Sequence, residues 1–318
     1  MGRAMRIDIA AQTDIGRRKK NNEDHHGVFR DDSEGLRLFN EGAMLCVADG
    51  LGGHVGGEIA SKLAVSMMRD ILKMEPVPDT EADPDDPKAD STGIFAALRE
   101  GFRKANEAIF RTNQDLVKEG RPMGTTLLAA VITPRKAYIG NVGDSRCYHI
   151  RDGEIIDRTE DHSWVDEQVK AGLMSKSEAE KDNRKNIVTR CIGTQAEVEM
   201  DAYLWRIVPG DRLLLCTDGL VNMATDSEIV AEFRKNLAPA EIAQRLVALA
   251  NENGGKDNIT VLIADISPSP WTVLARRIRM FSRRRGARIV WTLLIVLGIL
   301  LGYVAGFLTC YFTLVNRG

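Results

Sequence analysis

Five aspartates in this 318-residue chain share one local setting, because each lies at the end of an apolar segment or in a tight turn beside it. They are Asp24, Asp49, Asp144, Asp218 and Asp257. A single Asp-Gly pair after a strand usually marks only a turn. Five such positions predict carboxylates that a sheet holds in place, and the glycines after Asp49 and Asp218 leave room for a carbonyl group or a bound ion.

Carboxylates that converge without cysteine or clustered histidine favour hard cations with oxygen ligands, such as Mg²⁺ or Mn²⁺. Two such ions can hold a shared water as hydroxide and neutralise phosphate charge during in-line displacement. These residue types therefore predict metal-assisted hydrolysis of a phosphoester, and they do not by themselves choose between a phosphatase and a nuclease. Residues 1–265 carry 35 basic and 45 acidic side chains, a net charge of −10 that would repel a polyanion, so a nuclease and a nucleic-acid partner are disfavoured.

The elements that would position these aspartates are strands that follow one another as neighbours or hairpins. Apolar patterns predict strands at residues 7–15, 44–48, 125–132, 137–141, 146–150, 201–207, 212–216 and 259–266. Helices are predicted at residues 55–73, 94–118, 165–185, 227–236 and 239–253. Because the helices come in two groups and do not alternate with the strands, the predicted fold class is α+β, with antiparallel sheets flanked by helices.

The composition describes a globular protein. Hydrophobic residues make up 44% of the chain and charged residues 28%, which excludes a disordered or collagen-like protein. The five cysteines are odd in number and none belongs to a CxxC pair, so neither a disulfide framework nor a thiolate zinc site is expected. No nucleotide-binding motif of the GxGxxG or GxxxxGKS/T type is found in the sequence.

The C-terminal region is basic and then apolar. Residues 289–315 contain no charged side chain over 27 positions, and a helix of that length spans about 40 Å against roughly 30 Å of hydrocarbon. Seven arginines precede it within residues 276–288, so the positive-inside rule predicts that the whole domain before the span lies in the cytoplasm. We therefore expect a single-pass transmembrane helix at 289–315, in contact with membrane lipid, after an Arg-rich juxtamembrane linker at 267–288. The linker would either lie on the anionic membrane surface or form a solvated tether.

Eight short motifs, taken in order, resemble those of the protein phosphatase 2C family of metal-dependent Ser/Thr phosphatases, in its bacterial form. They are TDIG with NED at 13–24, DGLGGHVGG at 49–57, MGTT at 123–126, GDSR at 143–146, TEDHS at 159–163, TRCIG at 189–193, PGDRLLLCTDGL at 209–220 and DNIT at 257–260. The resemblance covers residues 7 to about 266 and identifies residues 1–266 as a catalytic domain. It implies a four-layer sandwich of two antiparallel sheets flanked by helices, with metal ions at one end.

The resemblance also implies two or three Mn²⁺ or Mg²⁺ ions as cofactors. Asp49 matches the carboxylate that bridges two metals, and the Gly50 carbonyl serves one of them. Asp218 and Asp257 match further ligands of the first metal. His54 matches the general acid that protonates the leaving Ser or Thr oxygen, a role that suits a pKa near neutrality. The expected catalytic residues are therefore His54, Asp49 and Asp218.

The resemblance extends to a second metal, a third metal and the substrate phosphate. Glu23 and Asp24 match the acidic pair that holds the second metal, partly through water, and Asp144 matches a ligand of a third, weaker metal in bacterial members. Where the family usually has a phosphate-binding arginine, this chain has Lys19, which supplies charge without the planar fork. In an extended segment, Arg17 would point to the same side and share the task; the alternative is a solvated basic run.

A second departure concerns residues 182–186, which read DNRKN where family members commonly have His-Pro-x-Arg-Asn. They belong to the polar segment 165–185, which matches the mobile flap thought to shape substrate choice. Substrate specificity is therefore the property that the resemblance transfers least.

The function that the resemblance implies is hydrolysis of phosphoserine and phosphothreonine by a metal-bridging hydroxide, without a phosphoenzyme. The expected partners are phosphoproteins, among them a Ser/Thr kinase or its substrates, which this enzyme would oppose at the cytoplasmic face of the cell membrane. Two alternatives stay open: a pseudophosphatase that acts as a binding module, and a phosphatase for a phosphorylated anti-sigma-factor antagonist.

Overall fold

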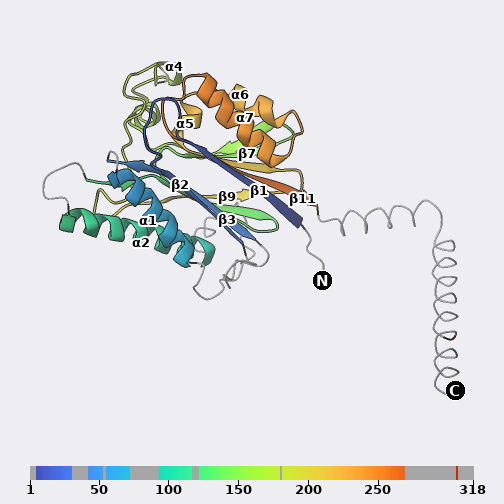
Figure 1. Cartoon of the computed structure of the whole chain (residues 1–318), viewed down its shortest axis with the longest axis horizontal. Helices are drawn as coiled ribbons and strands as arrows, with labels where there is room; N and C mark the ends of the chain where they lie inside the picture. The colour runs from blue at the N-terminus through green and yellow to red at the C-terminus, as the bar shows by residue number, and fades with distance from the viewer. Residues whose placement is uncertain are drawn as a thin grey trace. The chain divides into compact units, whose positions relative to one another are not determined.

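The structure is a computed structural model that describes residues 5–30, 42–52, 55–71, 93–116, 122–179, 181–268 and Gly306. Contacts divide the chain into a unit formed by Met5–Ser267 and a second formed by Met1–Ala4 with Pro268–Gly318. The elements described below belong to the first unit, apart from the last residue of β11, and are labelled in Figure 1.

Two sheets form the centre of the fold. The first, called the β10 sheet, has the strand order β1 (Met5–Asp14), β11 (Ile259–Pro268), β10 (Arg212–Cys216), β7 (Arg146–Arg151) and β8 (Glu154–Arg158). The second, called the β3 sheet, has the order β2 (Asp24–Arg30), β3 (Ala43–Leu51), β5 (Leu127–Ile132), β6 (Lys136–Val142) and β9 (Asp201–Arg206), with β4 (Gly124–Thr125) paired to β3. The strand pairings are antiparallel in both sheets.

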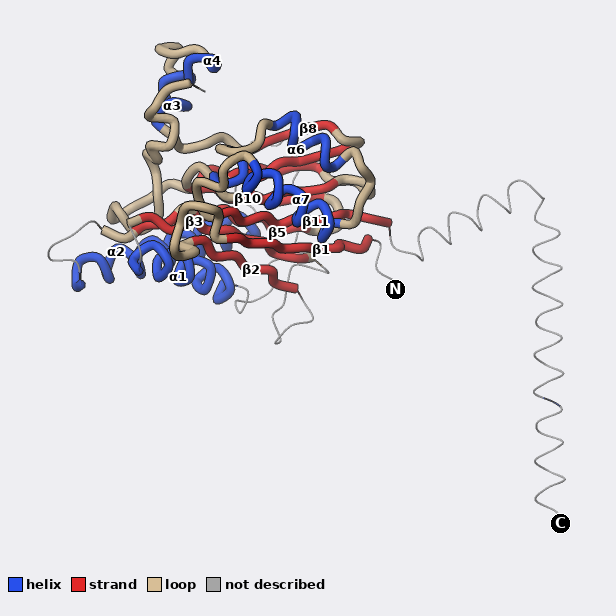
Figure 2. The backbone as a smooth tube through the Cα atoms, turned by 45° about the horizontal axis from the view of Figure 1, so that its top comes forward, coloured by secondary structure: helices blue, strands red, loops and turns tan. Residues whose placement is uncertain are grey.

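Helices cover the outer face of each sheet. Helices α1 (Val55–Ile71) and α2 (Gly93–Leu116) lie along the β3 sheet, and α5 (Asp218–Val221), α6 (Asp226–Phe233) and α7 (Pro239–Glu252) lie along the β10 sheet. Two short helices, α3 (Trp164–Lys170) and α4 (Lys176–Ala179), belong to a segment that stands out from the sheets (Figure 2). The α+β prediction, with two antiparallel sheets flanked by helices, is confirmed.

Three apolar layers hold this arrangement together. Along β3, Met44 and Cys46 pack under α1 and α2, whereas Leu45 and Val47 pack between the two sheets. Along β10, Leu214 packs under the helices of the opposite side. Because both faces of these central strands are covered, their sequences are apolar without alternation. This explains why short apolar runs located the central strands correctly.

Two local predictions differ from the structure. The edge strand β2 has no apolar run and was not expected as a strand; it pairs with one neighbour, and most of its side chains are partly exposed. The other edge strand, β8, follows the hairpin turn that the sequence predicts at 151–154. The single helix expected at 165–185 is wrong, because α3 stops at Lys170 and Gly172 adopts a φ of +71°, which ends a right-handed helix. Only one further turn of helix, α4, follows in that segment.

The predicted membrane span lies outside the described residues, except for Gly306, and so does the linker after Pro268. Among the residues that the structure describes, no helix combines the length and the apolar content needed to cross a bilayer.

Candidate metal centre

Strands β2 and β3 place two of the aspartates opposite each other. Their antiparallel register pairs Asp24, the first residue of β2, with Asp49 near the end of β3. Directly opposed residues in such a pair have Cβ atoms about 5 Å apart on the same face of the sheet. The register alone therefore brings these two carboxyl groups together.

The β10 sheet supplies the hydrogen bonds of Asp24. Thr217, which follows β10, and Thr260 in β11 donate hydroxyl hydrogen bonds of 2.9 and 2.7 Å to Asp24 Oδ2. The side chain is 8% exposed, and its Oδ1 atom has no hydrogen-bond partner among the described residues. The two sheets thus meet at this carboxylate, and one of its oxygens remains available to a ligand.

Asp218 follows the same strand after Thr217 and begins α5. Its Oδ2 accepts a 3.0 Å hydrogen bond from Asn222 Nδ2 one turn later, while its Oδ1 is buried without a partner in the described part of the chain. A Cβ atom on the next residue, Gly219, would overlap the carbonyl oxygen of Asn258. The glycine therefore lets the turn after Asp218 pack against the segment that leads into β11.

Asp144 lies in the turn between β6 and β7, where the chain passes from the β3 sheet to the β10 sheet. The Thr126 hydroxyl oxygen joins this turn to Asp49, because it accepts the Asp49 N–H at 2.9 Å and lies 2.9 Å from Ser145 Oγ. Asp144 itself is 7% exposed. A fourth carboxylate is thus fixed at the same end of the sandwich.

Asp257 precedes β11 and meets Lys19 from the loop after β1. Lys19 Nζ lies 2.5 Å from Asp257 Oδ1, which also accepts the Asn258 N–H at 2.8 Å. Burial acts to lower the pKa of Lys19, but the hydrogen bond and charge of Asp257, together with the charges of Asp49 and Glu23, outweigh it and raise the pKa. Lys19 therefore faces the carboxylates and does not belong to a merely solvated basic run.

Glu23 and Gly50 approach each other through their backbones. The Gly50 N–H and the Ser61 hydroxyl donate hydrogen bonds of 3.2 and 2.6 Å to the Glu23 carbonyl oxygen. A Cβ on Gly50 would overlap the Gly57 carbonyl oxygen, and a Cβ on Gly57 would overlap Glu23 Oε2. The two glycines therefore let β3, α1 and Glu23 pack closely at this point.

Asn258 holds several of these segments together, although the sequence analysis gave it no role. Its Nδ2 donates to the carbonyl oxygens of Ile15 and Asn21, both at 2.9 Å, and its Oδ1 accepts the Glu23 N–H at 2.8 Å. The residue is 2% exposed. Its place in the DNIT motif was the one signal that could have identified it, and the two threonines that bind Asp24 are likewise motif residues without an assigned role.

Of the two remaining candidate residues, Arg17 is described and His54 is not. Residues 16–18 form a turn, with a φ of +81° at Gly16, so the extended segment expected around Arg17 is wrong. The Arg17 N–H donates to the Gly255 carbonyl at 2.7 Å, and the strand alternation that would align Arg17 with Lys19 does not apply. His54 lies outside the described residues, so its role as general acid stays a prediction.

Four of the carboxyl groups have raised pKa values. Burial, the largest cause in each case, raises the pKa of Asp24 to about 7 and that of Asp218 to about 6. It also raises the pKa values of Asp49 and Asp144 well above the usual range, and the neighbouring carboxylates raise them further. The site therefore gathers negative charge that disfavours ionisation of its own members.

The donor chemistry of this site fits a hard divalent cation. In the described part of the chain, no three His, Cys, Asp or Glu side chains are arranged to hold a metal ion as they stand. Asp24, Asp218 and Asp257 are instead paired with Thr217, Asn222 and Lys19. All the gathered donors are nevertheless oxygens, and Asp24 and Asp218 each keep one buried, unpartnered oxygen. Bound divalent cations would satisfy such oxygens and offset the repulsion that contributes to these raised pKa values.

Comparison with known proteins agrees with this arrangement. The family described as protein phosphatase 2C matches residues 21–252. The serine/threonine phosphatase stp of Listeria monocytogenes is 35% identical over 261 residues, which cover 80% of this chain and 94% of that protein.

Solved structures give the same result. The S. agalactiae serine/threonine phosphatase superposes with a TM-score of 0.69 at 32% identity, covering 82% of this chain and 99% of that one. The catalytic domain of the phosphatase PstP, in complex with two manganese ions, superposes with a TM-score of 0.65 at 32% identity, covering 82% and 98%. The family expected from the eight motifs is thereby confirmed: this chain belongs to the protein phosphatase 2C family of serine/threonine phosphatases.

Proposed function

We propose that this protein is a metal-dependent phosphatase that hydrolyses phosphoserine and phosphothreonine in proteins and opposes a Ser/Thr kinase. The observation that carries the proposal is the gathering of Asp24, Asp49, Asp144 and Asp218 from both sheets into one largely buried group of carboxyl groups that repel one another. A structural role alone does not explain such a group, because it destabilises the fold unless a cation or a proton neutralises it.

The residues proposed to hold two or three Mn²⁺ or Mg²⁺ ions are Glu23, Asp24, Asp49, Gly50, Asp144, Asp218 and Asp257. Bound divalent cations would supply positive charge for the phosphate and activate water for attack on phosphorus. Two manganese ions in the related PstP catalytic domain support this assignment. The retained carboxylates also favour a catalytic protein over a pseudophosphatase that only binds.

Lys19 and His54 complete the proposed site. The Lys19 ammonium group pairs with Asp257 at the carboxylate cluster, and its proposed role is to neutralise a phosphate oxygen there. His54 would protonate the leaving Ser or Thr oxygen, a role for which the imidazole pKa is suited. Arg17 is the weaker candidate for phosphate binding, because its segment is a turn.

The proposed location is the cytoplasmic face of the cell membrane. It rests on the uncharged residues 289–315 and on the arginines that precede them. A tether of this kind would raise the local concentration of the enzyme towards membrane-bound kinases and their substrates. A phosphorylated anti-sigma-factor antagonist would be hydrolysed by the same chemistry.

The test is hydrolysis of a phosphothreonine peptide by the full-length protein with Mn²⁺, with Mg²⁺ or with a chelator, in the wild type and in Asp218→Asn. We expect activity with a divalent cation, loss of activity with the chelator and a large loss in the variant. Asp226→Asn is the matched control, because Asp226 also begins a helix but pairs with Tyr148 and Arg158. Metal-independent hydrolysis, or full activity of Asp218→Asn, would refute the proposal.

A further inference from the structure

The buried histidine His162 holds the residue before Asp144 at both of its backbone groups. Its ring atom Nδ1 accepts the Gly143 N–H at 3.0 Å, and its own backbone N–H donates to the Gly143 carbonyl oxygen, also at 3.0 Å. His162 is 3% exposed. A side chain and a backbone group of one residue therefore hold both peptide groups of Gly143, and the second of these groups joins Gly143 to Asp144.

The hydrogen bond from Gly143 fixes the protonation of the ring. A backbone N–H can only donate, so Nδ1 must accept and the neutral ring carries its proton on Nε2. Nε2 lies 3.0 Å from Asp201 Oδ2, to which it donates. Asp201 thus selects the one tautomer that can hold the Gly143 N–H.

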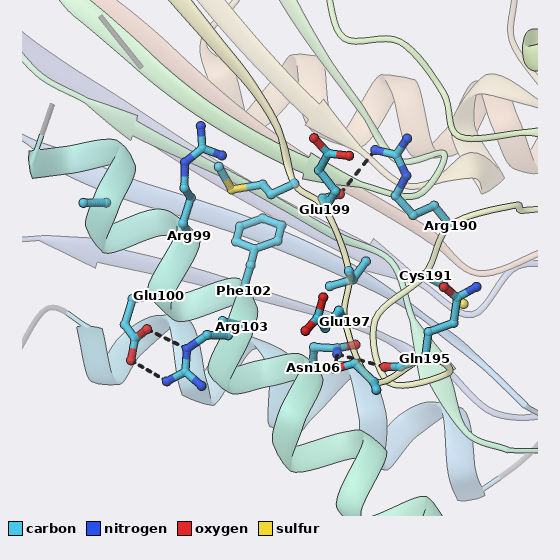
Figure 3. A pocket seen from close by; sticks show the side chains of 14 residues that line it. Arg99, Glu100, Phe102, Arg103, Asn106, Arg190, Cys191, Gln195, Glu197 and Glu199 are labelled. Atoms are coloured by element: carbon cyan, nitrogen blue, oxygen red, sulfur yellow. Dashed lines mark hydrogen bonds and ion pairs between the residues drawn. The ribbon is translucent and has the colours of Figure 1, made fainter. Parts of the chain in front are cut away.

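Arg190 supports the same carboxylate from outside. Its Nη1 lies 2.6 Å from Asp201 Oδ1, 3.2 Å from the Glu199 carbonyl oxygen and 3.2 Å from His162 Nε2, at the edge of an open pocket between α2 and residues 190–200 (Figure 3). Arg190 and His162 therefore donate to different oxygens of Asp201. This chain of contacts leads from the surface to the Gly143 peptide without touching a proposed metal ligand.

The turn that carries Asp144 has little freedom of its own. Gly143 has a φ of +115°, and a Cβ at this position would lie 2.6 Å from Thr126 Cβ, so the turn packs closely against Thr126 between β4 and β5. Small displacements of Gly143 would consequently be passed on to the Asp144 carboxyl group. The Asp144 carboxyl group is repelled by the charge of Asp218, so the position of Asp144 affects the electrostatic repulsion within the site.

We propose that His162 is a positioning residue that sets the Asp144 carboxylate for metal binding, with Asp201 fixing the histidine tautomer. The inference rests on the proposed function, because it takes Asp144 to be a metal ligand. It assigns His162 an effect on the cation that Asp144 serves and none on cations held by the other carboxylates.

The test is Mn²⁺ titration of the full-length protein by calorimetry, in the wild type, His162→Leu, His162→Asn, Asp144→Ala and the double variant His162→Leu/Asp144→Ala. We expect His162→Leu to weaken the weakest Mn²⁺ site by about tenfold, as the loss of a residue that orients a metal ligand commonly does, and to leave the tighter sites unchanged. His162→Asn should restore most of the affinity, because an amide oxygen can accept the Gly143 N–H. In the Asp144→Ala background, His162→Leu should cause no further loss.

His149→Leu is the matched control. His149 is 1% exposed and hydrogen-bonded to Asp211 at the beginning of β10, whereas the site follows the other end of that strand. This variant should lose stability and keep wild-type Mn²⁺ binding. Wild-type binding in His162→Leu, or an equal loss with and without Asp144, would overturn the inference. If Asp144→Ala itself binds Mn²⁺ as the wild type does, the metal role of Asp144 and the inference both fail, while phosphopeptide hydrolysis still decides the proposed function.

Discussion

Thr260 in β11 donates a 2.7 Å hydrogen bond to Asp24 at the beginning of β2, and this bond joins the two sheets at the site. The residues are separated by 236 positions in the sequence. Asp24 in turn faces Asp49 through the β2–β3 register, and a slip of one residue would turn one of the two carboxylates to the opposite face. The site therefore depends on the register within one sheet and on the contact between both.

Asp24→Asn should stabilise the metal-free protein and destabilise the metal-bound one. Because the folded-state pKa of Asp24 is raised to about 7, above an unfolded value of about 3.9, wild-type stability is full below about pH 4 and falls as the pH rises through 7. The neutral amide escapes this loss and can still accept hydrogen bonds from Thr217 and Thr260. With chelator, the melting temperature of the variant should exceed that of the wild type near pH 8 and equal it near pH 4. With Mn²⁺ near pH 8, the wild type should have the higher melting temperature. Equal melting temperatures near pH 8 with chelator would contradict this prediction.

Lys19→Ala should raise KM for a phosphopeptide several-fold and change kcat less. The ammonium group would otherwise offset part of the repulsion between the carboxylates and an incoming phosphate. Lys19→Arg should keep a KM near that of the wild type, because the guanidinium retains the charge and adds a planar fork. Steady-state kinetics check this, with Lys20→Ala, an exposed neighbour, as control. Wild-type kinetics in Lys19→Ala would remove Lys19 from the site.

Gly16→Ala should impair both stability and metal binding. Gly16 has a φ of +81°, and a Cβ there would overlap the Asp257 carbonyl oxygen. Gly172 is the matched control, because it has a φ of +71° but open space around it, so Gly172→Ala should cost only the conformational penalty of about 1–2 kcal/mol. Urea unfolding and Mn²⁺ titration measure the two effects. Identical results for the two variants would show that the contact with Asp257 is unimportant.

Asp211→Asn should destabilise the protein near neutral pH by about 3 kcal/mol, as expected when one partner of a buried ion pair is lost. Burial opposes the charge of Asp211, but hydrogen bonds from Arg151 and His149 outweigh it and lower the pKa. A lowered folded-state pKa gives stability that is present above about pH 4 and is lost as the pH falls through that folded value. The difference between wild type and variant in urea unfolding should therefore shrink in strong acid. A difference that stays constant with pH would argue against a charged Asp211.

A chain that ends at Pro268 should hydrolyse a small phosphate ester as the full-length protein does. The compact unit is Met5–Ser267 and β11 ends at Pro268, so this truncation leaves every described strand intact. After cell fractionation, the truncated protein should be in the soluble fraction and the full-length protein in the membrane fraction. A truncated protein that remains with membranes would refute the anchor at 289–315.

The sequence identified the central strands and the long helices because their burial is uniform. β3, β5 and β10 are covered on both faces and therefore read as apolar runs, and α1, α2 and α7 begin and end within two residues of the predicted bounds. β2 was missed because an edge strand that begins with Asp-His-His carries no such pattern. The prediction of a single helix at 165–185 was wrong because composition alone does not reveal which glycine adopts a left-handed backbone conformation and ends the helix.

The site shows the same division. The aspartates could be identified one by one, since each follows a strand or lies in a tight turn. Their partners could not, because bonds such as Thr217 to Asp24 or Asn258 to Glu23 join segments that only the completed fold brings together. The pairing of Lys19 with Asp257 likewise depends on the turn at Gly16, which the expected extended conformation did not include.

The strand order has a consequence for how the enzyme is made. β1 is at the edge of the β10 sheet, and its neighbour there is β11, the last strand of the domain. During synthesis on the ribosome, β1 cannot pair with β11 until β11 has been translated. Asp257, just before β11, and Thr260, within it, are likewise among the last site residues to be made. A nascent chain would consequently have no phosphatase activity until the whole domain has been translated. Incomplete chains could therefore not dephosphorylate proteins.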